Sequence, residues 1–385
     1  MQKLKSVIFE PWGNEGQAHY IHSLCQELYK YSDITLITGG KYLLKNENKK
    51  YRVKYIANGL WFENRRKIFR VFKLLNYLKF LIVFYFYLKK NNPQIVHYQF
   101  LVLPFIDYYY LRILKKHYLL VLTVHDISPL SEKGYLKYKW NECFKLFDKL
   151  IVHSKFAKDE IINLNIADEQ TIKMIPHGGY SYMIGKWPPI EKNYAKKMMN
   201  IKSKYVLILL GSILPYKGHA AAIEIMNLLV NSLKMDIVLV IAGSSRGESI
   251  EYLIKKINKN KLNNNIILWN KSLSFDEMRN IISCSDAGLM PYTRITTPGV
   301  GLMLQTYGIP LICTKIEGLT DLISDNINGF FICNEIEKTS RKIQSVLETK
   351  GEIEQMSQNS INKIKKEHNW GKIAEDTYNV YCGKL

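Results

Sequence analysis

The sequence predicts an α/β protein with two doubly wound parallel sheets. Short apolar runs alternate with longer segments of helical periodicity in both halves of the chain, as is typical of parallel strands covered by helices. The chain has 385 residues, and single hydrophobic cores stop growing at roughly 250–300 residues, so two domains are expected. Polar and glycine-rich segments follow several apolar runs, and open parallel sheets bind ligands at the carboxyl ends of their strands.

Twelve apolar runs are expected to form the strands, six in each half. In the N-terminal half they cover residues 6–9, 34–38, 95–98, 119–124, 149–152 and 172–175. In the C-terminal half they cover residues 205–210, 237–242, 266–269, 287–290, 310–313 and 329–332. The segments between them have the apolar spacing of helices.

The domain boundary is expected near the middle of the chain, where the pair Pro188 and Pro189 prevents a continuous helix. We assign residues 1–184 to an N-terminal domain, 185–204 to a linker and 205–365 to a C-terminal domain. Residues 366–385 repeat apolar side chains on one helical face, so this segment is expected to pack back on the N-terminal domain as a helix.

Composition excludes several classes of protein. With 47% hydrophobic residues the chain has ample material for a core, which excludes a disordered chain. Its six cysteines form no C-x-x-C pair and have no histidine at ligand spacing, which predicts a reducing compartment and no metal site. The first apolar run suits a strand, so no signal peptide is expected and the protein is predicted to be cytoplasmic. The longest apolar run, nine residues at 80–88, is shorter than the about 20 that a membrane-spanning helix needs.

Basic charge is concentrated in the N-terminal half. The chain has 54 Lys and Arg against 34 Asp and Glu, and residues 41–90 alone carry 14 basic and 2 acidic side chains. This excess predicts an anionic partner, and by charge alone both nucleic acid and anionic lipid qualify. Since no nucleic-acid recognition motif accompanies the charge, nucleic acid is not expected as a partner.

One basic segment is typical of a helix that lies on an anionic membrane surface. Residues 61–73 mix aromatic side chains with basic ones, as interfacial helices do. The basic side chains are Arg65, Arg66, Lys67, Arg70 and Lys73. The following run, 80–88, is apolar nearly all round and is expected to be buried in the N-terminal core.

Two strand-end loops of the N-terminal half carry candidate site residues. Gly13 and Gly16 precede a helix whose N-terminus favours an anion, although an ordinary strand-to-helix turn explains them equally well. His125 and Asp126 follow the run 119–124, and either side chain can act as a general base on a hydroxyl. The structural alternative is that Asp126 caps the next turn and His125 packs in the interior.

The C-terminal half has two loops suited to phosphate. Gly211 and Lys217 lie between a strand and a helix, where backbone N–H groups and an ammonium can hold an anion; the alternative is a solvent-facing lysine. A second helix start offers N–H groups, a hydroxyl and a cation, and its candidate residues are Arg294, Thr297, Gly299 and Val300. Two such helix starts in one domain predict a diphosphate ligand.

A series of short segments occurs in an order known from one enzyme family. In the C-terminal half these are G-S-I-L-P-Y-K-G, V-L-V-I-A-G, S-D-A-G-L-M-P-Y and Y-G-I-P-L-I-C. In the N-terminal half they are T-V-H-D-I-S-P, L-I-V-H-S-K-F-A and I-P-H-G-G-Y. Together they resemble family-4-like glycosyltransferases of the GT-B fold over essentially the whole chain. The resemblance implies two Rossmann-like domains facing across a cleft, with a nucleotide diphosphate-sugar donor on the C-terminal domain and the acceptor on the N-terminal domain.

The resemblance also implies roles for the candidate residues. Lys217 would contact the diphosphate, and Gly299 and Val300 would offer it helix-start amides. The loop 13–16 would face the donor, while His125 and Asp126 would lie near the sugar and the acceptor hydroxyl. The family resemblance implies no metal and no cofactor beyond the donor substrate.

Two features depart from the family pattern. The usual E-x7-E pair would fall at Ile295 and Met303, so both glutamates are missing, and the arginine common before the phosphate lysine is absent. The sequence looks closer to a subgroup with a Thr-Ser-Gly helix start, here Thr297-Pro298-Gly299. These departures leave open whether transfer retains or inverts the sugar configuration.

The predicted function is transfer of a sugar from a nucleotide diphosphate-sugar to a lipid-linked or membrane-proximal glycan acceptor, in surface polysaccharide or glycoconjugate synthesis. Such an enzyme is expected at the inner face of the membrane as a peripheral protein. The alternative from another class is a catalytically inactive GT-B protein that serves as a sugar-binding or partner subunit. Among enzymes, a GT-B epimerase is the main rival.

Overall fold

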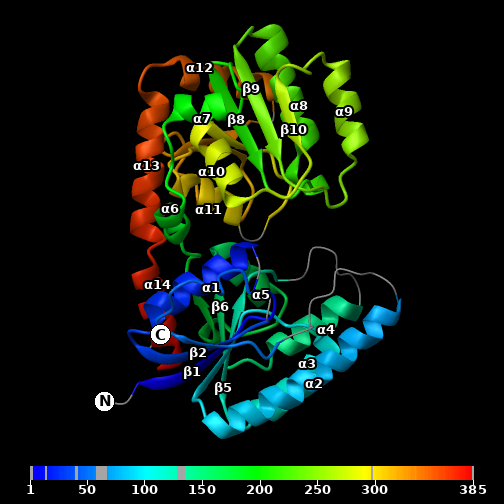
Figure 1. Cartoon of the computed structure of the whole chain (residues 1–385), viewed down its shortest axis with the longest axis vertical. Coiled ribbons are helices and arrows are strands. Elements are labelled where there is room, and N and C mark those ends of the chain that lie inside the picture. Colours follow the sequence, from blue (N-terminus) through cyan, green and yellow to red (C-terminus); the bar gives the residue numbers. More distant parts are fainter. Residues whose placement is uncertain are drawn as a thin grey trace. The chain divides into compact units, whose positions relative to one another are not determined.

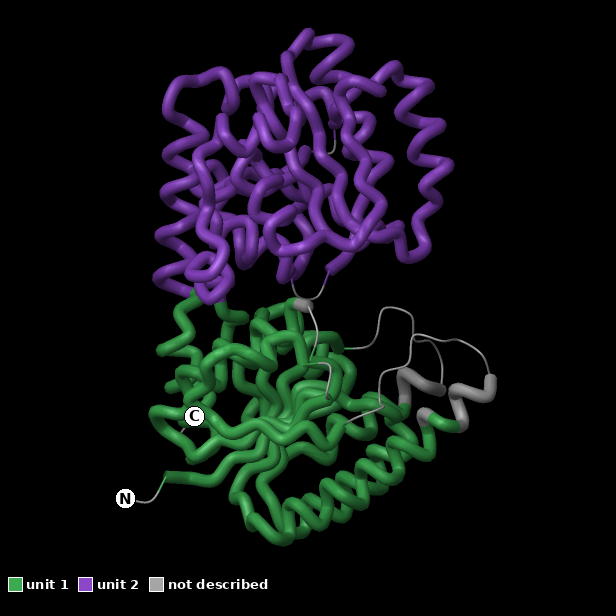
Figure 2. Tube along the Cα trace, viewed as in Figure 1, with its two compact units in different colours: residues 1–178, 368–385 green, residues 179–367 purple. Residues whose placement is uncertain are grey.

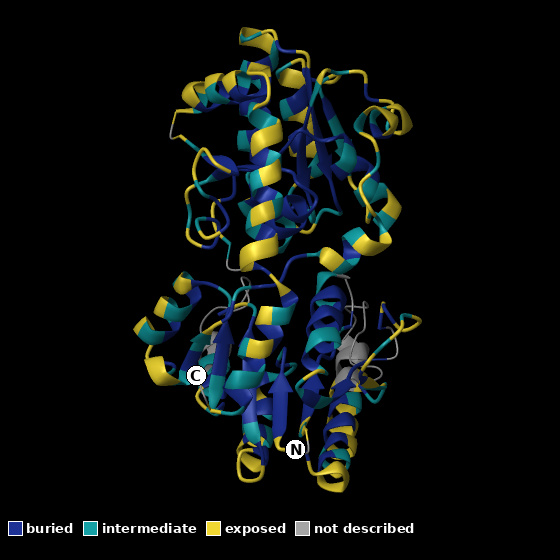
Figure 3. Cartoon of the chain, turned by 90° about the vertical axis from the view of Figure 1, so that its left-hand side faces the viewer, coloured by how far each residue is buried: buried dark blue, intermediate teal, exposed yellow. Residues whose placement is uncertain are grey.

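The computed structural model describes residues 3–13, 15–39, 42–57, 67–127, 135–295, 298–333 and 335–383 (Figure 1). The chain forms two compact units, Met1–Gly178 with His368–Leu385 (unit 1) and Gly179–Glu367 (unit 2) (Figure 2). Each unit contains a parallel sheet covered by helices, which confirms the predicted fold class. Apart from one short edge strand, the strands of both sheets are largely buried, while the helices expose their outward faces (Figure 3).

The sheet of unit 1 has the strand order β3-β2-β1-β4-β5-β6-β7, and neighbouring strands in it run parallel. Its strands are β1 (Leu4–Phe9), β2 (Ser32–Ile37), β3 (Arg52–Lys54), β4 (Ile95–Tyr98), β5 (Leu119–Val124), β6 (Lys149–Val152) and β7 (Ile172–Met174). All six predicted strands are present. Strand β3 is an addition to the prediction, because a three-residue edge strand with two basic residues has no apolar run.

The helices of unit 1 cover both faces of this sheet. They are α1 (Glu15–Leu28), α2 (Lys67–Asn91), α3 (Pro104–Leu114), α4 (Tyr135–Phe144), α5 (Lys155–Asn163), a short turn at Glu169–Thr171, and α14 (Trp370–Tyr381). One hydrophobic cluster joins α2 and α3 to the same sheet face, where Phe9 stacks on Phe80 with ring centroids 5.1 Å apart. Helix α14 packs against α1.

Helix α2 corrects one expectation from the sequence. Composition predicts that residues 80–88 are buried, yet Ile82 and Phe86 are 59% and 67% exposed. Only one face of α2 packs on the sheet, through side chains that include Phe80, Phe84 and Leu88. Since the run is apolar on all sides, its composition does not distinguish the inward from the outward face.

The sheet of unit 2 has the order β10-β9-β8-β11-β12-β13, again with parallel pairings. Its strands are β8 (Tyr205–Leu210), β9 (Ile237–Ala242), β10 (Ile266–Trp269), β11 (Ala287–Met290), β12 (Leu311–Thr314) and β13 (Gly329–Ile332). Alternate residues of β8 enter two separate hydrophobic clusters, Ile208 in one and Leu207 and Leu209 in the other. Both faces of this sheet are therefore buried, as in doubly wound folds.

The helices of unit 2 are α6 (Ser181–Lys186), α7 (Lys192–Met198), α8 (His219–Asn227), α9 (Ile250–Lys259), α10 (Phe275–Cys284), α11 (Gly299–Thr306), α12 (Ile336–Glu348) and α13 (Glu352–Glu367). A 3₁₀ turn at Pro215–Lys217 precedes α8, and a π-helical segment at Leu228–Ser232 continues it. Much of the segment that we expect as a linker, 185–204, is helical because it contains α7 and the end of α6.

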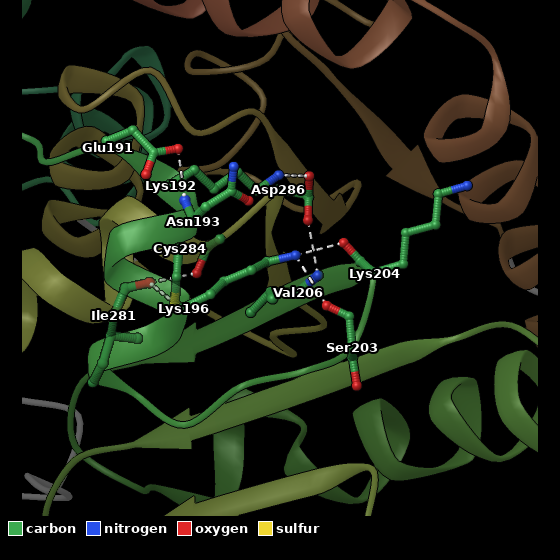
Figure 4. A network of polar contacts seen from close by, with 11 residues as sticks. Glu191, Lys192, Asn193, Lys196, Ser203, Lys204, Val206, Ile281, Cys284 and Asp286 are labelled. Carbon is green, nitrogen blue, oxygen red and sulfur yellow. Dashed lines mark hydrogen bonds and ion pairs between the residues drawn. The ribbon is translucent and has the colours of Figure 1, made fainter.

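A polar network holds α7 to the sheet (Figure 4). Lys192 forms an ion pair with the buried Asp286, whose other carboxylate oxygen accepts a hydrogen bond of 2.8 Å from the Val206 backbone N–H. Lys196 donates to the carbonyl oxygens of Ser203 and Lys204, at 2.9 and 2.6 Å. These contacts anchor the segment before β8 within unit 2.

No helix in the described part of the chain is long and apolar enough to cross a membrane. The six cysteines, all among the described residues, are free thiols, and four of them are buried.

Candidate functional site

Three candidate residues of unit 2 meet at the carboxyl end of β8. Gly211 follows this strand with φ +96°, and a Cβ atom placed there would lie 2.7 Å from the Lys217 Nζ and 3.1 Å from the Val300 Cγ2. Strands β8 and β11 are neighbours in the sheet, so the loops that follow them share one edge. Only glycine fits at position 211 without displacing the ammonium.

Lys217 is not the solvent-facing lysine of the alternative interpretation. Its side chain is buried, with 5% of the residue exposed. The Nζ atom donates to the Leu210 carbonyl oxygen at 3.3 Å and lies 5.5 Å from the centre of the Tyr292 ring. Burial lowers the pKa of Lys217 to about 8. Within the described residues no carboxylate lies at ion-pair distance from this ammonium, which therefore has charge available for an anionic ligand.

The turn that carries Lys217 is fixed by its own sequence. Pro215 starts the 3₁₀ turn, and Gly218 ends it in the left-handed conformation with φ +69°. A Cβ on Gly218 would lie 1.9 Å from the Pro291 carbonyl oxygen, so the turn packs directly on the loop after β11. The Thr293 backbone N–H donates to the Tyr216 carbonyl oxygen at 2.8 Å and ties the same two loops together.

Helix α11 begins beside this turn. Gly299 and Val300 are its first residues, and the first N–H groups of a helix have no acceptor within the helix and carry partial positive charge. The Tyr292 ring lies next to the Lys217 ammonium, and its hydroxyl is buried with no hydrogen-bond partner among the described residues. An ammonium beside helix-start amides is a set of donors that can hold a phosphate.

The other two candidates of unit 2 differ from these. Arg294 is exposed, and its guanidinium lies 5.8 Å from the centre of the Tyr216 ring. Tyr216 directly precedes Lys217 in the sequence. It can reach a ligand at the same turn. Thr297 lies outside the described residues.

The glycine loop of unit 1 is organised by a residue that the sequence analysis did not consider. The buried Glu10 accepts hydrogen bonds from the backbone N–H groups of Trp12, at 3.1 Å, and of Gly13. Gly13 has φ +62°, and a Cβ there would lie 2.9 Å from the Thr38 Oγ1. Burial raises the pKa of Glu10 to about 7, although both hydrogen bonds favour the ionised form. Gly16 lies in the first turn of α1.

His125 and Asp126 lie in different surroundings although they are adjacent. The His125 ring stacks on Phe100 with centroids 4.8 Å apart, and its Nε2 lies 3.0 Å from the Gln99 Oε1. Asp126 is exposed. Both line a small pocket of about 90 Å³ together with aromatic side chains that include Trp140 and Phe144. His125 thus packs as in the structural alternative, while Asp126 is accessible to a bound hydroxyl.

A cluster of histidines surrounds His125. Strands β5, β6 and β7 are neighbours, and the segments after them place His125, His153 and His177 in a row with successive ring centroids 5.1 and 5.3 Å apart. Tyr20 of α1 contacts all three rings. Burial lowers the pKa of His153 to about 4 and that of His177 to about 3, and the pKa of His125 lies well below its usual value for the same reason. The cluster is therefore neutral near pH 7.

The sequence contains a signal for this cluster that we did not use. The segments V-H-Y-Q, T-V-H-D, I-V-H-S and I-P-H-G place His97 within β4, His125 and His153 directly after β5 and β6, and His177 three residues after β7. Parallel neighbouring strands bring such positions to one edge of the sheet. In the described part of the chain, no group of three or more His, Cys, Asp or Glu side chains is arranged to hold a metal ion.

Two family models match this chain, one in each half. Residues 14–178 match Glycosyltransferase Family 4, and residues 191–363 match Glycosyl transferases group 1. The chain is a family 4 glycosyltransferase with the GT-B fold. It uses a nucleotide-sugar donor, as this family does.

Individual relatives of this glycosyltransferase are distant. UDP-Gal:alpha-D-GlcNAc-diphosphoundecaprenol alpha-1,3-galactosyltransferase from Escherichia coli is 27% identical over 272 residues, which is 68% of each chain. HepE from Anabaena, solved in complex with UDP and glucose, superposes with a TM-score of 0.75 at 13% identity, covering 98% of this chain and 99% of HepE. WaaG, a glycosyltransferase involved in lipopolysaccharide biosynthesis, gives a TM-score of 0.68 at 13% identity, covering 99% of this chain and all of WaaG.

Proposed function

We propose that this glycosyltransferase transfers a hexose from a UDP-sugar to a lipid-linked glycan acceptor in surface polysaccharide or glycoconjugate synthesis, at the inner face of the membrane. The convergence of Gly211, Lys217 and the start of α11 on one point carries the proposal, because it creates a buried cationic site that suits a diphosphate. The Escherichia coli relative, which acts on a diphosphoundecaprenol-linked sugar, supports the acceptor class. That relative and the UDP complex of HepE support uridine as the nucleoside of the donor.

In this proposal unit 2 stabilises the leaving group. The bond between the sugar C1 and the diphosphate oxygen breaks, and negative charge develops on the departing UDP. Lys217 and the amides of Gly299 and Val300 face that charge from fixed positions, which is how preorganised donors lower a barrier. We also assign Arg294 and Thr297, which precede α11 in the sequence, to the donor site.

Unit 1 supplies the acceptor side. The acceptor hydroxyl oxygen forms the new bond to C1 and loses its proton to a base. Asp126 is the residue that we assign to this step, since it is exposed at the rim of a pocket, while the neutral His125 positions the loop through Phe100 and Gln99. From the family resemblance we assign Gly13 and Gly16 to donor binding, and the Gly13 backbone N–H donates to Glu10.

The missing glutamate pair bears on the mechanism. In the family pattern these carboxylates fall at Ile295 and Met303, and Met303 is buried in the hydrophobic core. Neither side chain can hydrogen bond to a sugar hydroxyl or to a nucleotide ribose. We therefore propose that sugar recognition here relies on other residues, as in the subgroup with a Thr-Ser-Gly helix start. The same departure is the reason to test for an inactive sugar-binding subunit.

The test combines ligand binding with turnover. A ligand that binds only the folded state raises the melting temperature, so UDP, GDP, ADP and CMP are compared by thermal shift, and UDP is expected to give the largest effect. Turnover is then measured as UDP release from UDP-sugars with a diphosphate-lipid-linked sugar acceptor. UDP binding without sugar transfer to any acceptor would favour the inactive subunit, and a converted UDP-sugar without acceptor would favour an epimerase.

A further inference from the structure

The outward face of α2 is an exposed apolar surface. Its large exposed side chains are Phe72, Leu74, Leu75, Leu78, Ile82, Val83 and Phe86. Of these, Leu75, Ile82 and Phe86 are spaced seven and four residues apart, so they line one side of the helix, opposite the buried Phe80 and Phe84. Isolated exposed apolar residues are ordinary, but a contiguous stripe of this kind marks an interaction surface.

Helix α3 extends this surface. It exposes Phe105, Tyr109 and Ile113, which are spaced four residues apart and so share one face. The Tyr110 hydroxyl donates to the Leu81 carbonyl oxygen at 3.1 Å, and the Tyr77 hydroxyl donates to Asp107, so the two helices are fixed to each other. Both pack on the same face of the sheet, and their outward sides therefore point the same way (Figure 1).

The surface is basic as well as apolar. Lys79 lies within the apolar stripe of α2, and Lys89 and Lys90 end it, all with exposed side chains. Helix α2 contains no acidic residue over its 25 positions. The only acid of α3, Asp107, is buried, where it accepts hydrogen bonds from Tyr77 and the backbone N–H of Leu103.

Charged side chains on the neighbouring elements do not change the positive net charge of this surface. Arg112 and Lys116 are exposed at the end of α3, beside Lys115. Asp148 forms an ion pair with Lys115 at 3.5 Å, and on α4 Glu142 pairs with Lys145, so both acids are already matched by a cation. The described part of this face thus offers cations around an apolar centre.

We propose that the exposed faces of α2 and α3 form a docking surface for an anionic lipid bilayer. Apolar side chains would enter the boundary between head groups and acyl chains, while lysine and arginine stems reach up to the lipid phosphates. At about 1.5 Å per residue α2 is about 37 Å long, so this helix would lie along the membrane plane. The purpose of docking, access to a lipid-linked acceptor, rests on the function proposed above; the docking itself rests on the surface alone.

Charge complementarity selects the bilayer over other occupants. A second copy of this chain meeting the same face would bring two basic surfaces together, which is repulsive. A nucleic acid would match the cations but leave the seven exposed apolar side chains of α2 without a partner. The basic stretch at 61–66, including Arg65 and Arg66, lies outside the described residues, as do the side chains of Lys67, Arg70 and Lys73, and the docking surface is defined without them.

The experiment is co-sedimentation of the full chain with phosphatidylcholine vesicles and with mixed phosphatidylcholine and phosphatidylglycerol vesicles. The test variant is Ile82→Gln with Phe86→Gln, both outward-facing and therefore compatible with folding. The matched control is Tyr252→Gln with Ile254→Gln, two side chains that are 49% and 44% exposed on α9 of unit 2. A charge variant changes Lys79, Lys89 and Lys90 to Gln.

Wild type and control are expected to bind the mixed vesicles, with binding that weakens as salt is raised, and not the neutral ones. Both α2 variants should lose about tenfold or more of the apparent affinity. The charge variant loses attraction to the anionic lipid, and the Ile82/Phe86 variant loses two apolar side chains that would enter the bilayer. UDP binding should be unchanged in all variants, which separates failure of docking from failure of the proposed function. Equal vesicle binding by wild type and the Ile82/Phe86 variant would overturn the proposal. So would a wild-type dimer that this variant converts to a monomer.

Discussion

The Nζ atom of Lys217 occupies the space that a side chain on Gly211 would need, 2.7 Å from the point where the Cβ would be placed. The absence of a side chain at one position therefore permits a buried cation at the other. This pair connects the end of β8 with the turn before α8, and Val300 at the start of α11 closes the same space at 3.1 Å. The donor diphosphate site that we propose would depend on all three positions.

Gly211→Ala should weaken UDP binding by at least tenfold, because the added methyl group displaces the Lys217 ammonium. The control is Gly247→Ala, since Gly247 has a similar φ of +107° but no atom within 4 Å of the position that its Cβ would take. Both substitutions place alanine at a positive φ and so share the same backbone strain. A difference between their UDP affinities, measured by isothermal titration, therefore reports the contact with Lys217. Equal affinities of the two variants would contradict the assigned role.

Lys217→Ala should cut kcat/KM for the donor by at least tenfold, since a hydrogen bond to a charged group contributes about 1.5–3 kcal/mol.

In wild type, UDP affinity should fall as pH rises through about 8, because the pKa of the free Lys217 ammonium lies there and the group loses its proton. The stability of the unliganded protein depends on pH in the opposite direction. The folded protein releases this proton at lower pH than the unfolded chain, so the unliganded protein gains stability between about pH 8 and 10.5.

The pH profile of UDP binding checks both statements. Lys217→Met, which keeps the apolar stem, should show weak binding with no fall near pH 8. Lys255→Met on the exposed side of α9 should behave like wild type. A wild-type profile that is flat from about pH 7 to 9.5 would remove the basis for this role of Lys217.

Asp126→Asn should lower kcat by about 10²–10⁴-fold with little change in UDP affinity, if this carboxylate takes the acceptor proton. His125→Asn removes the ring that stacks on Phe100 and serves as the comparison. Steady-state kinetics with varied acceptor, together with UDP titration, separates the two effects. If the His125 variant is inactive and the Asp126 variant is nearly normal, the roles are reversed.

The histidine cluster should make unit 1 sensitive to acid. His153 and His177 have folded-state pKa values of about 4 and 3, below the usual value of 6.5. The unfolded chain therefore binds more protons between these values, and stability is lost as pH falls from about 6.5 toward 4. His177→Gln, which cannot become charged, should flatten the fall in melting temperature over this range. His117→Gln, a histidine outside the cluster, should leave it unchanged. A wild-type melting temperature that does not change with pH over this range would contradict the predicted effect of the buried histidines.

Local patterns predict most of the fold. Twelve strands are recognisable because each is a short apolar run that is largely buried, and the strand-end rule brings Gly211, Lys217 and Val300 to one edge. Strand β3 has no such run. The outward exposure of Ile82 and Phe86 also has no signal, because α2 is apolar on all sides and only packing decides which side faces the sheet.

Contacts between distant parts of the sequence are harder to predict. The Nδ1 atom of His368 lies within hydrogen-bond distance, 2.6 Å, of the His177 carbonyl oxygen, although these residues are 191 positions apart in the sequence. Glu10 escapes notice in the sequence because an acid after a strand resembles an ordinary polar loop residue. Its role follows only from burial and from the two backbone N–H groups whose hydrogen bonds it accepts.

Helix α14 belongs to unit 1 but follows all of unit 2 in the chain. Its Tyr381 hydroxyl bonds to the buried His97 at 2.7 Å, and its Trp370 packs against Gly178 so closely that a Cβ there would lie 2.2 Å from the ring. During synthesis on the ribosome, residues 1–178 therefore emerge without the helix that covers His97 and Tyr20. Domains usually fold as they are made, N-terminal first. Here unit 1 can complete its packing only after residues 179–367 of unit 2 have been translated.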